Sequence, residues 1–216
     1  MIGLPAAVQK LLISLGFVVI QVLTNSVGTV TIAAFAVSSK LDSFAQIPSA
    51  NLADALSVFT AQNIGAEKYD RIDKGYKSTM MISTVLCILI TLLLLFFSKQ
   101  LMRLLVTDFQ VISIGVKYIK FVSIFYILYS FMIITNGLLL GYGNSIIALI
   151  GTIVSFICIQ IPLALILSST MGASGIYSAI PFGWGGGLIL RLYFYRKLTN
   201  KNKRADDYKI TGVIKN

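Results

Sequence analysis

The stretch PSANLADALSVFTAQNIGAEKYDRIDKGYK, residues 48–77, determines how the rest of the chain is interpreted. Its first part is an apolar helix that carries one carboxylate, Asp54. Its second part is a turn at 62–66, followed by a charged loop at 67–77. A carboxylate in an apolar helix is costly in lipid and usually faces protein or an aqueous interior. Asp54 is therefore the first candidate for chemistry.

The composition is that of a membrane protein. Of the 216 residues, 56% are hydrophobic and 12% are charged, and the mean hydropathy is +0.86. A soluble domain carries about 25% charged residues, so the expected solvent is lipid. The net charge of +10 does not indicate nucleic-acid binding, because the basic residues gather at the edges of apolar segments and form no basic face with interleaved aromatic residues.

The residue types argue against enzyme and metal chemistry. The chain has no histidine, and its two cysteines, Cys87 and Cys158, fall inside apolar segments without metal-ligand spacing. We expect both thiols to be buried and structural. No nucleophile–base pair or pair of catalytic carboxylates can be assembled from the sequence. The sequence thus predicts no enzyme activity, no bound metal and no cofactor.

The apolar runs predict an all-α membrane protein with six transmembrane helices, because about 20 apolar residues cross a bilayer. Residues 38–43 predict a polar connection, 99–106 a short helix along the membrane interface, and Gln160 with Pro162 a kink in the fifth span. The six-helix unit covers 1–196, and 197–216 is predicted to be a basic, disordered cytoplasmic tail. The predicted spans are 4–25, 44–64, 80–97, 118–140, 146–167 and 176–195.

The distribution of basic residues predicts the orientation. With the N-terminus inside, thirteen of the 18 lysines and arginines fall on the cytoplasmic side and five on the outer side. The positive-inside rule then places both termini in the cytoplasm of a multi-pass protein of the plasma (inner) membrane.

Polar residues share faces on three of the predicted spans. Asn51, Ser57 and Gln62 cluster around Asp54 on the second span. Gln21 and Asn25 belong to a polar seam of the first span. Tyr126 and Tyr129 belong to one of the fourth, together with Gly137 and Gly141. Such seams serve either a cavity or hydrogen bonding between helices, and the sequence leaves both open.

Taken in order, the motifs resemble the C-terminal half of a multidrug and toxic compound extrusion (MATE) transporter. The resemblance covers about residues 1–196 and rests most specifically on the turn Gln62-Asn63-Ile64-Gly65-Ala66 before a basic loop. Gly3-Leu4-Pro5 at the first span, Ala33-Ala34, Pro48 and Leu104-Leu105-Val106-Thr107-Asp108 support it as an ensemble.

The resemblance implies a twelve-helix antiporter of two six-helix lobes, which expels cationic or amphipathic drugs or metabolites in exchange for sodium ions or protons. The present chain supplies one lobe, so a second lobe or a homodimer partner is expected. The first span lacks the glutamate of some members and has Ile13 at about that depth. Asp54 matches no family cation site, and its candidacy rests on physical grounds alone.

We hypothesise that Asp54 binds a proton or a cationic group in a cavity formed with the polar residues of the three seams. Competition between two cations for one carboxylate is sufficient for exchange. The alternative is that Asp54 pairs with Lys10 or accepts hydrogen bonds from its own helix. The proposed site consists of Asp54, Asn51, Ser57, Gln21, Asn25, Tyr126 and Tyr129.

Two other functions are open at this stage. A non-transporting remnant of a truncated or split reading frame is one, because Met1 stands almost at the first span. A flippase for lipid-linked sugars, from the related superfamily, is the other. A flippase site would favour several basic residues to hold pyrophosphate, and only Lys10 is available.

Overall fold

The computed structural model describes the backbone of residues 3–25 and 28–210, and the side chains within 7–198 except those of residues 10, 17 and 25–27. Every regular element of the described backbone is helical. In order, the helices are α1 (Gly3–Asn25), α2 (Thr29–Gly65), α3 (Tyr69–Leu105), α4 (Phe109–Ser123), α5 (Tyr126–Gly141), α6 (Ser145–Ile153), the π-helical segment η1 (Val154–Gln160), α7 (Ile161–Met171) and α8 (Ala173–Ile210).

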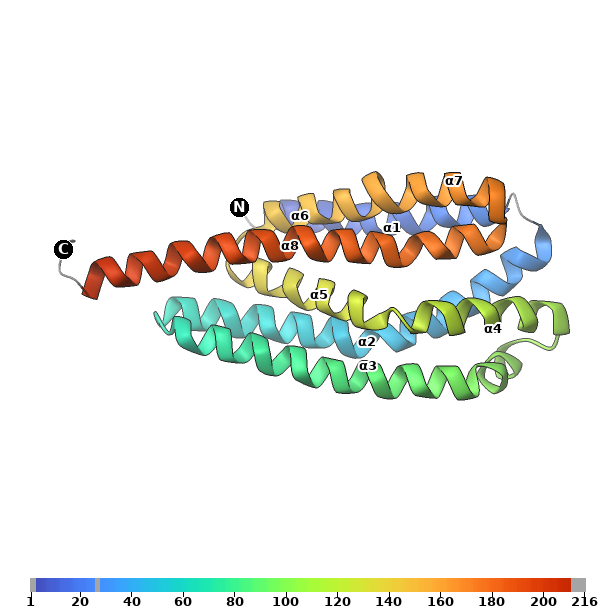
Figure 1. Cartoon of the computed structure of the whole chain (residues 1–216), viewed down its shortest axis with the longest axis horizontal. Helices are drawn as coiled ribbons and strands as arrows, with labels where there is room; N and C mark the ends of the chain where they lie inside the picture. Colours follow the sequence, from blue (N-terminus) through green and yellow to red (C-terminus); the bar gives the residue numbers. More distant parts are fainter. Residues whose placement is uncertain (1–2, 26–27, 211–216) are drawn as a thin grey trace.

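The helices form an elongated bundle of antiparallel rods in two groups (Figure 1). One group contains α1, α6, α7 and α8, and the other contains α2, α3 and α4, with α5 lying between them. In agreement, α5 packs against both α2 and α8. The start of α1, the α2–α3 turn and the far end of α8 lie at the same end of the bundle (Figure 1).

Three described helical stretches are long and apolar enough to cross a membrane, at Ala7–Thr24, Tyr69–Leu105 and Ser145–Met171. The pair α4 and α5 adds a fourth if a bend of 56° is allowed within one span. These segments overlap the predicted spans at 4–25, 80–97, 118–140 and 146–167, whose boundaries stay predictions. The described parts of α2 and α8 do not meet the same criterion, so the spans at 44–64 and 176–195 stay predictions.

Several predicted boundaries are wrong. Residues 38–43 are not a connection, because α2 runs without interruption from Thr29 to Gly65. The predicted loop at 67–77 is reduced to residues 66–68, and residues 99–105 are the end of α3 rather than a separate short helix. The predicted tail is helical as far as Ile210. The predictions ended each helix where its apolar part ends. In the structure, the helices continue through the polar and charged segments beyond that point.

Two of the rods are bent or distorted. The fourth predicted span is broken at residues 124–125, where the chain makes a turn between α4 and α5. The kink predicted at Gln160 and Pro162 coincides with η1, whose π-helical turn ends at Gln160, and Pro162 occupies the first turn of α7. Proline has no backbone N–H to donate, so it interrupts the helical hydrogen bonds at the point where the π-helical turn ends.

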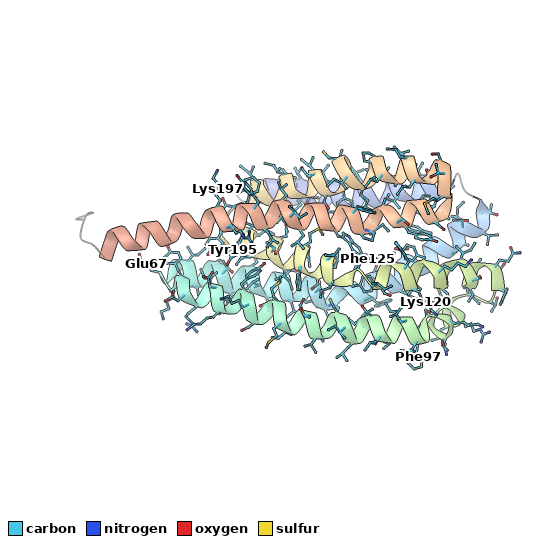
Figure 2. The ribbon with its side chains drawn as sticks, in the orientation of Figure 1. Glu67, Phe97, Lys120, Phe125, Tyr195 and Lys197 are labelled. Atoms are coloured by element: carbon cyan, nitrogen blue, oxygen red, sulfur yellow. The ribbon has the colours of Figure 1, made fainter. Side chains whose placement is uncertain are left out.

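The bundle is apolar on its outside as well as in its core. Val85, Leu89, Leu93 and Phe96 of α3 are all exposed. Figure 2 shows Phe97 pointing away from the bundle. An exposed apolar surface of this extent would be a liability in water and is suited to lipid.

Glycines bring α5 close to α2. A methyl group on Gly137 would collide with the backbone of Ala53, and one on Gly141 would lie 2.6 Å from the carbonyl oxygen of Ser57. Both positions belong to the polar seam predicted on the fourth span. This part of the seam therefore serves helix contact.

Candidate functional site

A cavity of about 350 Å³ lies between the two groups of helices. Six elements of this chain contribute to its wall: α1, α2, α4, α5, η1 and α8. Aromatic rings and polar side chains share the lining with aliphatic ones. The lining residues are Ile13, Ile20, Gln21, Phe35, Ser39, Asp42, Ser43, Gln46, Tyr118, Tyr129, Met132, Ile133, Phe156, Gln160, Ile180 and Trp184.

Within the part of the chain whose side chains the structure describes, Asp42 of α2 is the only formally charged residue of this lining. Its side chain is 7% exposed. The hydroxyl of Tyr118 donates a hydrogen bond to Oδ2 at 2.6 Å, and the hydroxyl of Tyr126 donates to Oδ1. Because each carboxylate oxygen has two lone pairs, both oxygens can accept a further bond. The partners found for Asp42 are thus neutral, and its charge is available to a cation.

Aromatic rings stand next to this carboxylate. Tyr129 and Trp184 have ring centroids 5.3 Å apart, and Tyr126 lies 6.3 Å from Trp184. Tyr118, which holds Asp42, contacts Phe35 edge-to-face at 5.6 Å. Faces of aromatic rings attract cations, so the wall complements the charge of the carboxylate.

The predicted site residues are only partly brought together. Gln21 and Tyr129 line the cavity. Tyr126 is not part of the lining, but its hydroxyl donates a hydrogen bond to Asp42, which is. Asp54 and Asn51 are exposed on α2 and are not part of the lining, while Ser57 is half-buried against Gly141. The side chains of Asn25 and Lys10 lie outside the described residues.

The motif turn at 62–66 forms the end of α2. The side-chain amide of Asn63 donates to the carbonyl of Phe59 at 2.7 Å, and the backbone N–H of Lys68 donates to the carbonyl of Asn63 at 2.8 Å. The backbone N–H of Ala66 donates to the carbonyl of Gln62, and Gly65 is exposed. Gln62, Asn63 and Gly65 thus close the α2–α3 connection.

A second polar cluster lies inside the bundle around Arg191 of α8, which is 3% exposed. Its guanidinium donates to Asn136 Oδ1 at 3.0 Å, Thr152 Oγ1 at 3.0 Å and the carbonyl of Gly187 at 3.1 Å. Gln9 donates to the same Asn136 and Thr152 oxygens, at 3.1 and 2.8 Å. All these acceptors are neutral, and the cluster joins α1, α5, α6 and α8. We interpret this group of side chains, called the Arg191 cluster below, as a structural link between the four helices.

Tyr195 makes a further contact between α8 and α3 near the end of the bundle where the chain starts. Its hydroxyl donates to Asp73 Oδ1 at 2.9 Å, and its ring lies 5.1 Å from that of Tyr76. Figure 2 shows Tyr195 on the side of α8 that faces the lower helices. Tyr76 in turn bonds Thr135 of α5 at 2.9 Å.

Other sequence expectations need correction or addition. Cys87 is buried as predicted, whereas Cys158 is exposed on η1. Asp42, Gln160 and Trp184 were not predicted as site residues. The signal for Asp42 was its spacing: Ser38, Asp42, Ser49 and Ala53 recur at helical intervals and are all buried on α2.

A bundle of apolar helices around a cavity with a buried carboxylate is typical of a membrane transporter. Comparison with known proteins defines the family: the MatE family model matches residues 5–166, so the chain belongs to the MatE family, which is a family of transporters and not of enzymes.

Relatives and solved structures agree with this assignment. The chain is 24% identical to the probable multidrug resistance protein YoeA of Bacillus subtilis over 94% of its length, and 26% identical to YpnP of the same organism over 90%. It spans 44% of each relative. Its fold matches an outward-facing MATE multidrug transporter with a TM-score of 0.87, at 19% identity, over 94% of this chain and 46% of that one.

Proposed function

We propose that this chain is the C-terminal half of a secondary active antiporter, which exports cationic or amphipathic compounds in exchange for sodium ions or protons. The observation that supports the proposal is Asp42, a buried carboxylate without a basic partner in a cavity lined by aromatic rings. The names of the relatives, which are multidrug resistance proteins, agree with such a role.

The charge of the cavity favours cations over anions. Asp42 is the only charged residue among the described residues that line it, and the buried Arg191 is engaged with Asn136 and Thr152 and is not part of the lining. A negative charge in a site of low dielectric attracts a cation strongly and repels an anion. This polarity supports a drug or cation exporter rather than a flippase for pyrophosphate-linked lipids.

Exchange would follow from competition at one carboxylate. The hydroxyls of Tyr118 and Tyr126 fix both oxygens of Asp42 in place. A proton, a sodium ion or a substrate cation would each neutralise the carboxylate, and no two of them can do so fully at once. A carrier that changes its orientation only when Asp42 is neutralised would couple the movement of one cation to that of another.

We further propose that the working transporter contains a second half of similar size, since the chain spans 44% of its relatives. In the proposed orientation, the bundle end that holds the start of α1 and the end of α8 faces the cytoplasm (Figure 1). The positive-inside rule supports this orientation.

Export of ethidium, a fluorescent aromatic cation, tests the proposed function in cells whose native gene carries Asp42→Asn. The substitution removes the charge but keeps the shape of the side chain. We expect the initial export rate to fall at least about tenfold, which corresponds to about 1.4 kcal/mol of lost interaction. Asp54→Asn on the same helix is the matched control and should export normally.

The two variants distinguish a cation site at Asp42 from a cation site at Asp54. Normal export by Asp42→Asn together with loss in Asp54→Asn would return the site to the carboxylate first indicated by the sequence. Normal export by both variants would show that neither carboxylate carries the transported cation.

A further inference from the structure

Gln160 is a buried polar side chain of the cavity wall and is 4% exposed. Among the side chains that the structure describes, its amide oxygen has no hydrogen-bond partner. An unpartnered buried acceptor is uncommon in native proteins and calls for an explanation. A ligand bound in the adjacent cavity, which donates a hydrogen bond to this oxygen, is such an explanation.

The surroundings of Gln160 leave its oxygen unpaired. The hydroxyl of Ser155, in the same π-helical segment, donates to the carbonyl of Gly183 at 2.6 Å. Gly183 lies against the glutamine amide: a methyl group there would be 2.9 Å from the side-chain oxygen. The glycine therefore leaves the amide room, and the terminal torsion of glutamine is soft enough for its oxygen to turn toward a donor.

The backbone at this position is also unusual. Gln160 is the last residue of η1, and short π-helical turns occur often at functional sites. The irregular turn places Gln160 on the same cavity as Asp42, Tyr129 and Trp184. This part of the wall combines a charged acceptor, Asp42, with a neutral acceptor, Gln160, and with the rings of Tyr129 and Trp184.

We propose that Gln160 determines specificity by accepting a hydrogen bond from a donor group of the ligand, at a point separate from its cationic end. The favoured ligands are aromatic ammonium compounds with a second O–H or N–H group. Their ammonium group binds Asp42, their ring lies against Tyr129 and Trp184, and their second donor reaches Gln160. This inference rests on the proposed function, because it needs a cation at Asp42.

Tyramine and 4-methoxyphenethylamine test the inference as a matched pair. Both are ammonium ions with a para-substituted ring, but only tyramine has a hydroxyl that can donate. Trp184 is the single tryptophan of the chain and lines the cavity, so its fluorescence reports binding to the purified protein in lipid nanodiscs. Excitation at wavelengths where only tryptophan absorbs avoids the signal of tyramine.

The wild-type protein should bind tyramine about fivefold more tightly than the methoxy compound, as expected for one hydrogen bond to a neutral acceptor. Gln160→Met has a similar length but no amide, and it should remove the preference by weakening tyramine alone. Gln160→Glu keeps an acceptor and should keep the preference. Gln62→Met, at an exposed position at the end of α2, is the control and should behave as wild type.

The outcomes separate this inference from the proposed function. Binding that depends on Asp42 but shows no preference for tyramine, or a preference that survives in Gln160→Met, would overturn the role of Gln160 alone. If neither amine changed the fluorescence of Trp184, or if Asp42→Asn bound both amines normally, the proposed cation site would fail as well.

Discussion

Asp42 illustrates how a bundle of apolar helices can retain a carboxylate without a basic neighbour. Burial of a charge is costly, and hydrogen bonds from Tyr118 and Tyr126 offset part of that cost. The remaining part is a driving force for any cation that enters the cavity. A buried salt bridge would have cancelled this driving force, so the absence of a basic partner in the described lining is consistent with a binding role.

The sequence indicated the kind of site but not the carboxylate. It pointed to a carboxylate beside Tyr126, Tyr129 and Gln21, and the structure brings these three residues close to Asp42. Asp54 was preferred because it interrupts an apolar run, whereas Asp42 stands among Ser38, Ser39, Lys40 and Ser43. Hydropathy cannot separate a polar helix face from a polar loop. Only the contact with α4 and α5 shows that Asp42 is buried.

Asn136 is predicted to stabilise the folded protein through the Arg191 cluster. Its side-chain oxygen accepts from both Arg191 and Gln9, so Asn136→Leu would leave a buried guanidinium short of an acceptor. We expect a loss of about 2–5 kcal/mol in the free energy of unfolding. Thermal unfolding of the detergent-solubilised protein would show it as a lower Tm.

Asn136→Asp is the matched variant, with nearly the same shape. It supplies a carboxylate to a guanidinium whose acceptors are all neutral, so it should be tolerated or raise Tm. If Asn136→Asp destabilised the protein as much as Asn136→Leu, the geometry of the amide and not the charge of Arg191 would determine stability here.

At the scale of elements, α2 shows where periodicity is more informative than hydropathy. Its buried residues Ser38, Asp42, Ser49, Ala53 and Leu56 continue one helical stripe across the segment that was predicted as a connection. The apolar spans of α1 and α3 were predictable because lipid selects against every polar residue. A helix surrounded by other helices carries no such signal, since small and polar residues are accepted there.

One irregular element was predictable in position but not in kind, and the other was not predictable from the sequence. Pro162 and Gln160 indicated a kink, and the structure has a π-helical turn ending at this point. The bend of 56° between α4 and α5 falls at Ile124 and Phe125, where the sequence contains neither proline nor glycine. A proline or glycine therefore does not account for that break.

Gly137 is predicted to set the distance between α2 and α5. A methyl group at this position collides with the backbone of Ala53, which cannot move aside as a side chain could. Gly137→Ala should therefore lower the free energy of unfolding by about 1–3 kcal/mol, which a thermal or denaturant melt would detect.

Gly185 of α8 provides the control, because a methyl group there meets no atom within 4 Å. Gly185→Ala should leave stability unchanged or raise it by up to about 1 kcal/mol through better helix propensity. If both alanine variants had the same effect, the close approach of α5 to α2 would not be the cause.

At the scale of the whole molecule, the cavity lies between two groups of helices that both come from this chain. Its wall contains residues of α1, α2, α4, α5, η1 and α8, and Asp42 and its tyrosine partners all belong to these elements. All the described residues of the cation site we propose therefore come from this chain, which spans 44% of its relatives. Transport would use a second half, whereas binding would not.

Binding of phenethylamine to the purified chain in lipid nanodiscs tests this central claim most directly. Titration should change the fluorescence of Trp184 saturably, and Asp42→Asn should weaken the affinity at least about tenfold while Asp54→Asn leaves it unchanged. Equal affinity of wild type and Asp42→Asn would contradict the assignment of the cation site to Asp42.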